Sequence, residues 1–158
     1  MKLVSASHSV GEANYHIQLT PAYRRDVFED ECVRVLTRDY LLAAASRHGI
    51  VVASIGFGEE HVHVFVVGCK NHSPAQVAFL LKGFSSYMMR KNHRALFKDK
   101  LYGKKFWSSG YFYRTVGAVS TDTVKKYVEE SQQKHWSKVE QADGQRSLIE
   151  FNSERSAL

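Results

Sequence analysis

Cysteine, proline and long apolar runs are scarce in this chain, and each shortage excludes a class of protein. The 158 residues contain two cysteines and two prolines. Cys32 and Cys69 lie far apart, without a CxxC or Cys/His zinc spacing, which argues against a disulfide framework and a structural zinc site. No apolar run reaches the roughly 18 to 20 residues of a membrane span, and the N-terminus lacks the apolar core of a signal peptide. We therefore expect a cytoplasmic protein with no membrane partner.

The residues that are plentiful indicate one folded domain with a basic surface. Hydrophobic residues make up 44% of the chain and aromatic residues 12%, which is enough to bury a sizeable core in one domain. Lysine and arginine number 22 against 16 acidic residues, a net charge of +6, and this excess favours polyanionic partners. The sequence after Trp136 is polar and aperiodic, so we expect a domain over residues 1–136 and a loosely ordered polar tail over residues 137–158.

Hydrophobic periodicity predicts the element order β-α-β-β-α-β-α. Alternating side chains and β-branched runs predict strands over residues 13–20, 50–58, 61–68 and 111–117. Three- and four-residue spacings predict helices over residues 26–48, 74–92 and 121–136, the last capped by Ser120. This order is that of a ferredoxin-like α+β fold, an antiparallel sheet with helices on one face, plus a C-terminal helix. The fold by itself names no function.

Two histidines stand one residue apart in the valine-rich stretch GEEHVHVFVVG, residues 58–68. Side chains alternate between the faces of a strand, so His61 and His63 share one face with Phe65, and Val62 points to the other. Two imidazoles about 7 Å apart can close on one divalent ion if a third ligand arrives from another element. Packing is the alternative, because a histidine on a strand is often a half-buried residue with its hydrogen bonds made.

Two enzyme classes that use closely spaced histidines are excluded by residues that are missing. Histidine-triad nucleotide hydrolases need H-x-H-x-H, and Phe65 stands at the place of their nucleophile. Two-histidine phosphoesterases need two H-x-[ST] motifs, and neither HVHV nor HIQL supplies one.

The last predicted helix carries Tyr127 directly after Lys125 and Lys126. An isolated tyrosine beside valines is more often a packing residue than a catalytic one. A tyrosine hydroxyl, with a reference pKa of about 10, becomes a useful nucleophile where a nearby dication favours its deprotonation. The helix alone therefore leaves both roles open.

Four stretches together resemble the single-tyrosine HUH transposases, the TnpA-type enzymes of small bacterial and archaeal insertion sequences. They are NYHIQLTPAYRRDVF, EEHVHVFVV, LKGFSSYMMRKN and LYGKKFWSSGYFYRTVGAVSTDTVKKYVEESQ, which cover about residues 13–133 in order. The resemblance implies a transposase that cleaves and rejoins single-stranded DNA. His61 and His63 would bind Mg²⁺ or Mn²⁺, and Tyr127 would attack the scissile phosphate to give a 5′-phosphotyrosine and a free 3′-OH. It also implies DNA with hairpin ends as the partner, and a homodimer in which each tyrosine helix can complete the other subunit's site.

The third metal ligand departs from the family pattern. The family usually has Gln or Asn four residues beyond the tyrosine, where both side chains share a helical face, and here Ser131 holds that position. Gln132 follows, and at about 100° per residue it lies about 140° around the helix from Tyr127. Gln132, Glu130 and Ser131 are therefore rival third ligands, and Glu59 is a further one because it shares the histidine face of its strand.

Basic residues gather in two parts of the chain, with aromatic residues beside them. Cations along a backbone path and aromatic faces for unstacked bases are what binding of single-stranded DNA requires. An ordinary solvated basic face is the alternative, and the family resemblance favours DNA. The candidate DNA-binding residues are Arg24, Arg25, Lys82, Arg90, Lys91, Lys104, Lys105 and Trp107.

Two other functions fit the same residues. A domesticated relative that processes chromosomal palindromic repeats would carry the same sequence features as a mobile transposase. A noncatalytic binder of single-stranded nucleic acid would share the fold, and Ser131 is its main support. We expect the metal-dependent transposase.

Overall fold

The computed structural model describes residues 3–117 of the chain. The predicted third helix and the polar tail lie outside the described residues. So do Tyr127, Glu130, Ser131 and Gln132.

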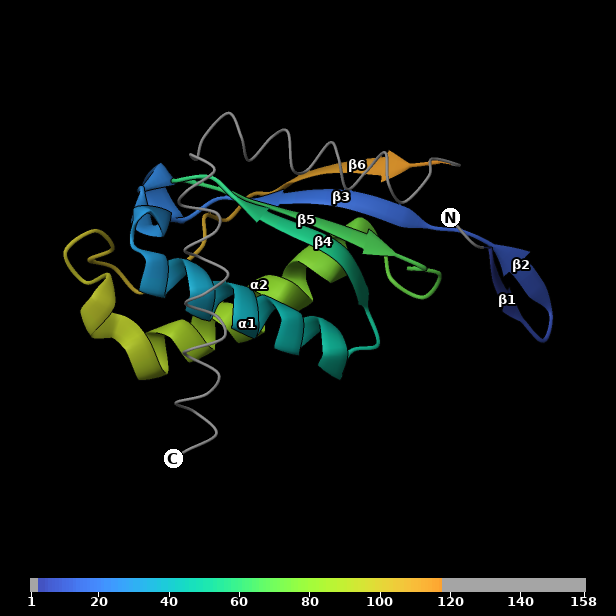
Figure 1. Cartoon of the computed structure of the whole chain (residues 1–158), viewed down its shortest axis with the longest axis horizontal. Coiled ribbons are helices and arrows are strands. Elements are labelled where there is room, and N and C mark those ends of the chain that lie inside the picture. Colours follow the sequence, from blue (N-terminus) through green and yellow to red (C-terminus); the bar gives the residue numbers. More distant parts are fainter. Residues whose placement is uncertain (1–2, 118–158) are drawn as a thin grey trace.

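A four-stranded antiparallel sheet forms the centre of the fold, and two helices cover one of its faces (Figure 1). The strands are β3 (Asn14–Leu19), β4 (Val51–Phe57), β5 (Val62–Val67) and β6 (Phe112–Val116), in the order β4-β5-β3-β6. The helices are α1 (Glu31–Arg47) and α2 (Pro74–His93). The short 3₁₀ turns η1 (Ala22–Arg24) and η2 (Val27–Glu29) lie between β3 and α1, and η3 (Arg94–Leu96) follows α2. This arrangement confirms the predicted ferredoxin-like class.

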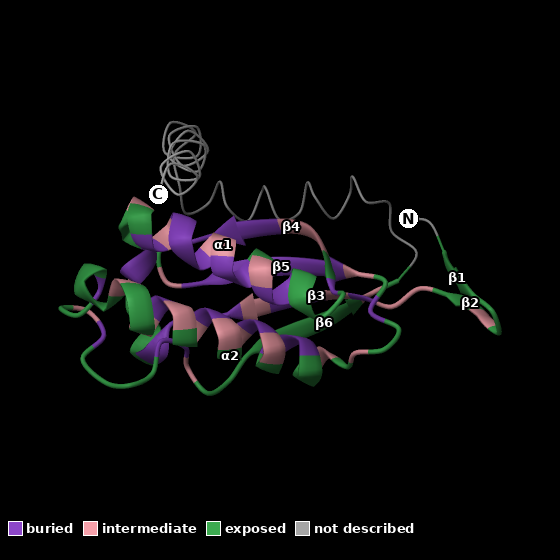
Figure 2. Ribbon diagram, turned by 90° about the horizontal axis from the view of Figure 1, so that it is seen from below, coloured by how far each residue is buried: buried purple, intermediate pink, exposed green. Residues whose placement is uncertain are grey.

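Side chains along β5 point alternately to the two faces of the sheet. Val62, Val64 and Val66 are fully buried in the main core, which they share with apolar residues of α1 and α2. Phe65 belongs to a separate cluster with Ala53, Val67 and Val116, as expected for the opposite face. Figure 2 shows the buried residues on the strands and on the inner sides of the helices. The core therefore fixes which side chains of β5 point away from the helices.

Helix α1 begins later than the sequence pattern predicts. The prediction started at Asp26, whereas Asp30 is the N-cap and accepts a hydrogen bond from the Val33 amide at 3.2 Å. Val27 and Phe28, which lie inside the predicted range, are buried in the 3₁₀ turn η2. A capping aspartate satisfies the first free amides of a helix and so marks its start more strongly than periodicity does.

Helix α2 begins where the sequence predicts. Pro74 occupies the first turn, and the side chains of Ser73 and Gln76 exchange hydrogen bonds with each other's backbone amides as a capping box. Within residues 3–117, no helix is long and apolar enough to cross a membrane.

A small hairpin of β1 (Val4–Ala6) and β2 (Ser9–Gly11) precedes β3 and was not predicted. It extends away from the main sheet (Figure 1). Its strands are short and mostly exposed, so they lack the alternation between buried and polar residues that reveals a strand in sequence.

Candidate metal centre and nucleic-acid interface

The two histidines of the HVH motif meet on the face of the sheet that points away from α1 and α2. His63 belongs to β5, and His61 lies directly before that strand. Their ring centroids are 4.8 Å apart and the rings meet edge to face. The side chains are only 5% and 7% exposed. The shared face predicted from strand alternation is confirmed.

A third histidine, which sequence reasoning missed, completes this cluster. His16 lies on the neighbouring strand β3, and its Nε2 is 2.9 Å from Nδ1 of His63. Burial lowers the pKa of His16, and the nearby Arg114 guanidinium lowers it further. The available signal was its place in NYHIQL, opposite in phase to the core residues Tyr15 and Ile17. That signal becomes informative only once β3 is known to pair with β5.

The histidine pair suits a divalent metal ion. A metal on His63 would use Nε2, because Nδ1 is engaged with His16, and such an outer hydrogen bond fixes the orientation of a ligating ring. Within residues 3–117, no group of three His, Cys, Asp or Glu side chains is placed to hold a metal ion. Glu59, named above as a further rival for the third ligand, therefore forms no such group with His61 and His63.

Gly58 leaves the space that the His61 ring occupies. A Cβ at this position would lie 2.4 Å from Cε1 and 2.7 Å from Nε2 of His61, closer than side chains approach without displacement. The Gly58 amide donates to the His61 carbonyl at 2.9 Å and closes the turn. Glycine at residue 58 is thus what allows the His61 ring to occupy its position in the site.

The turn before His61 is held from outside the sheet. The Phe28 amide of η2 donates to the Glu59 carbonyl at 3.1 Å, and Arg24 forms an ion pair with Glu60 at 3.4 Å. The 3₁₀ turns between β3 and α1 therefore position the loop that presents His61.

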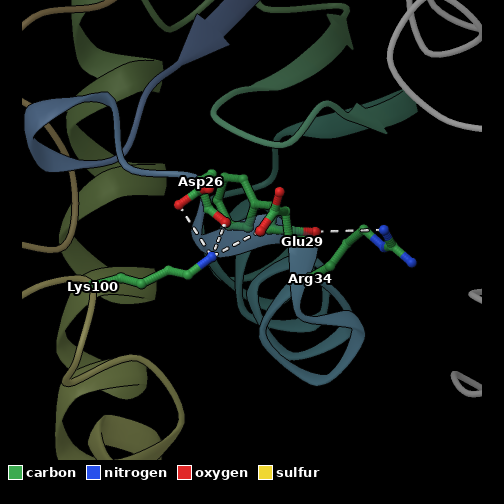
Figure 3. A network of polar contacts seen from close by, with 5 residues as sticks. Asp26, Glu29, Arg34 and Lys100 are labelled. Carbon is green, nitrogen blue, oxygen red and sulfur yellow. Dashed lines mark hydrogen bonds and ion pairs between the residues drawn. The ribbon is translucent and has the colours of Figure 1, made fainter.

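A charged network connects these 3₁₀ turns to the basic segment of the chain (Figure 3). The Lys100 ammonium lies 3.1 Å from Asp26 Oδ1 and 3.0 Å from Glu29 Oε2, and it donates to the Asp26 carbonyl at 3.0 Å. The hydrogen bond from Lys100 lowers the pKa of Asp26. One lysine thus joins the segment after α2 to the turns that hold the histidine loop.

A cavity of about 500 Å³ lies between α2 and the chain that leads to β6. The Lys82 ammonium donates to the carbonyls of Ser109 and Gly110 at 3.2 and 3.3 Å, and Lys105 donates to the Ser109 hydroxyl at 3.0 Å. Burial lowers the pKa of Lys82, and the charge of Lys105 lowers it further. Phe79 and Tyr111, which are both exposed, also line the cavity. Cations and exposed rings around one hollow suit a nucleic acid.

The other candidate DNA-binding residues occupy different environments. Arg24, Arg25, Lys91 and Lys104 are exposed. The Arg90 guanidinium donates to the Lys105 carbonyl and lies 5.7 Å from the Phe97 ring centroid. Arg90 therefore connects α2 to the basic segment.

The prediction that Trp107 is a DNA-binding residue requires a correction. It is 4% exposed, its Nε1 donates to the Ser85 hydroxyl at 2.9 Å, and its ring packs against Phe28 and Phe106. It belongs to the core and lines the cavity without offering a free face for stacking. The sequence pattern showed an aromatic residue among lysines, and it did not show which way the ring points.

Three comparisons relate the chain to proteins already known. The family described as "Transposase IS200 like" matches residues 9–131. The ISDra2 transposase TnpA of Deinococcus radiodurans is 27% identical over 125 residues, which are 79% of this chain and 88% of that protein.

Two solved structures share the fold. One is a crystal structure of a Deinococcus radiodurans R1 protein described as a transposase, with a TM-score of 0.63, 22% identity, and coverage of 85% of this chain and 99% of that one. The other is a REP-associated tyrosine transposase bound to a REP hairpin, with a TM-score of 0.51, 10% identity, and coverage of 74% of this chain and 62% of that one.

Replacing Gly58 with alanine is expected to weaken metal binding at least about tenfold, because the new Cβ pushes the His61 ring out of line with His63. Calorimetric titration with Mn²⁺ measures this. Gly11→Ala is the matched control, since nothing lies within 4 Å of a Cβ there. Equal Mn²⁺ affinity in the two variants would contradict the placement of His61.

Replacing His16 with phenylalanine is expected to lower Mn²⁺ affinity by roughly 10- to 100-fold, the usual effect of removing a hydrogen bond behind a ligating histidine. His16→Gln, which keeps a polar partner for His63, should lose less. His48→Phe removes the exposed histidine at the C-terminal end of α1 and controls for adventitious metal binding. If His16→Phe binds Mn²⁺ as tightly as the unaltered protein, His16 has no part in orienting His63.

Proposed function

Because the chain belongs to the IS200-like transposase family, with residues 9–131 matched, we propose that it cleaves and rejoins single-stranded DNA at insertion-sequence ends through a phosphotyrosine intermediate. The observation that carries this proposal is the meeting of His61 and His63 on one face of the sheet, 4.8 Å apart between ring centroids. The hydrogen bond between His16 and His63 supports a metal at this pair, because the second ring nitrogen of a ligating histidine is almost always held by such an outer partner.

His61 and His63 would hold Mg²⁺ or Mn²⁺, which when bound supplies positive charge beside the scissile phosphate. The nucleophile in this proposal is Tyr127. Its Oη, after losing its proton, attacks phosphorus, and the bond from phosphorus to the 3′ oxygen breaks. The 3′ oxygen takes up a proton, and the phosphoryl group stays on the tyrosine as a 5′-phosphotyrosine. Rejoining reverses these steps when a 3′-OH attacks the phosphotyrosine, so no external energy source is needed.

The third ligand in this proposal is Gln132, with Glu130 and Ser131 as its rivals. Metal sites in proteins commonly include more than two protein ligands, and residues 3–117 supply only the histidine pair. We also propose a homodimer in which each tyrosine helix can complete the other subunit's site. We propose a cytoplasmic location as well, since the proposed DNA substrate would be found there.

The DNA ligand is proposed to be a single strand with a hairpin. The REP-associated tyrosine transposase that shares this fold is bound to a REP hairpin, and this supports a hairpin for the present chain. The cavity beside α2 supplies Lys82 and Lys105 for phosphates and the exposed rings of Phe79 and Tyr111 for bases. A domesticated relative that acts on chromosomal palindromes would use the same surface.

A noncatalytic DNA-binding module is the second candidate function. It is favoured by the lack of a three-ligand group within residues 3–117 and by Ser131 at the family's ligand position. Such a module would bind DNA without forming a covalent bond to it.

The full chain, incubated with Mg²⁺ or Mn²⁺ and a 3′-labelled single strand carrying an insertion-sequence end, is expected to form a covalent adduct that survives denaturing electrophoresis. Tyr127→Phe should abolish the adduct, because it removes the attacking oxygen, and chelation of the metal should do the same. Tyr87→Phe, on the exposed side of α2, should leave it intact. An adduct that persists in Tyr127→Phe contradicts the assigned nucleophile, and DNA binding without any adduct favours the noncatalytic module.

Lys82→Gln and Lys105→Gln are each expected to weaken binding of a DNA hairpin and to reduce the slope of log K against log salt by about 0.9, the loss of one phosphate contact. Fluorescence anisotropy across a salt series measures the slope. Lys70→Gln is the control, since Lys70 contacts Ser9 of the small hairpin and lies outside the cavity lining. An unchanged slope in both cavity variants would remove this surface from the proposed interface.

A further inference from the structure

The chain adopts an unfavourable backbone conformation at Tyr23 and Arg24. Their φ angles are +57° and +51°, and no other non-glycine residue among residues 3–117 has a positive φ. This left-handed region brings the Cβ of an L residue too close to its own backbone, and a bulky aromatic residue is a rare occupant. Glycine or asparagine would fit the turn better.

The surrounding fold imposes this conformation. The Ala22 amide donates to the Phe106 carbonyl at 2.9 Å, and the Arg24 amide donates to the Pro21 carbonyl at 3.0 Å. Pro21 itself pairs with Trp107 as an isolated β-bridge. The turn is therefore held by backbone hydrogen bonds on the side of the core.

Packing does not explain why a tyrosine occupies this turn. The Tyr23 side chain is 83% exposed, more than any other large hydrophobic side chain within residues 3–117. The ring gains almost no burial, although the backbone beneath it is strained. Strained residues that persist without a packing benefit are concentrated at binding and catalytic sites.

Charge and shape around Tyr23 indicate what the ring binds. It lines a cavity of about 250 Å³ together with Lys104 and Lys105. Arg24 and Arg25 follow it directly and are exposed. An exposed aromatic face surrounded by cations matches a nucleotide whose base stacks on the ring while the cations attract its phosphates.

The turn is also tied to the histidine loop. The Arg24 guanidinium forms its ion pair with Glu60, at 3.4 Å, and Glu60 directly precedes His61. We propose that Tyr23 is a stacking platform for an unpaired base of the DNA strand that passes His61 and His63. This inference rests on the proposed function, because it assumes that single-stranded DNA is the ligand.

Fluorescence anisotropy with the full chain tests the platform, using a labelled oligothymidylate and an abasic strand of equal length as probes. Tyr23→Ala is expected to bind oligothymidylate roughly 5- to 150-fold more weakly, the range for losing one stacked base. Its affinity for the abasic strand should stay within about twofold, because the phosphate contacts are unchanged. Tyr23→Phe keeps the ring and should bind like the unaltered protein.

Two further variants separate stacking from folding. Tyr23→Gly should lose affinity for oligothymidylate as Tyr23→Ala does, while its unfolding midpoint in urea rises because glycine accepts the positive φ without strain. Tyr87→Ala is the matched control, since Tyr87 is 59% exposed on the regular helix α2 and should leave both affinities unchanged.

The inference is overturned if Tyr23→Ala binds oligothymidylate normally, or if it loses as much affinity for the abasic strand as for the thymidylate. If the Tyr127-dependent adduct still forms in either case, the proposed function stands and only the stacking platform fails. An unaltered protein that binds neither strand would overturn both together.

Discussion

The register of β5 between β3 and β4 is the constraint on which the rest of the site depends. His63 pairs with Gln18 on one side and with Gly56 on the other, while Val62 and Val64 enter the core beneath the helices. A slip of one residue would exchange the two faces, placing the imidazoles beneath the helices and the valines on the opposite face of the sheet. The free energy that buries the valines therefore also presents the histidines, and no separate interaction is needed to choose their face. The same register brings His16 of β3 within 2.9 Å of His63.

His61 lies outside the strand and is positioned by contacts of another kind. Gly58 makes room for its ring, and the amide of Phe28 holds the turn. The Lys100 network around Asp26 and Glu29 joins this support to the basic segment, with its side chains partly exposed, so its contribution to stability is small. Because the hydrogen bond from Lys100 lowers the pKa of Asp26, the network is at full strength above the ordinary aspartate pKa and weakens as the pH falls through the lowered value. Its importance lies in connecting the turns that hold the histidine loop to the basic segment after α2.

Sequence reasoning reached the fold and the histidine face because both follow from local periodicity. It missed His16, since the contact with His63 depends on which strands pair. It placed the start of α1 too early because it included the 3₁₀ turn η2, which precedes the Asp30 cap. Trp107 and Tyr23 show that local sequence patterns do not predict whether a single aromatic side chain is buried or exposed. The tryptophan that was expected at the surface is buried, and a tyrosine that drew no attention is exposed in a turn that local preferences disfavour. The assignments to Tyr127 and Gln132 lie outside the described residues and stay predictions.

The convergence of His61 and His63 on one metal ion is the central claim. Crystals of the full chain grown with Mn²⁺, measured for anomalous scattering at the manganese edge, test it most directly. We expect one anomalous peak, from a manganese ion bonded to both imidazoles, with His63 bound through Nε2 and its Nδ1 still paired with His16. Imidazoles on opposite faces of the sheet, or manganese bound elsewhere at saturating concentration with none at this pair, would contradict it.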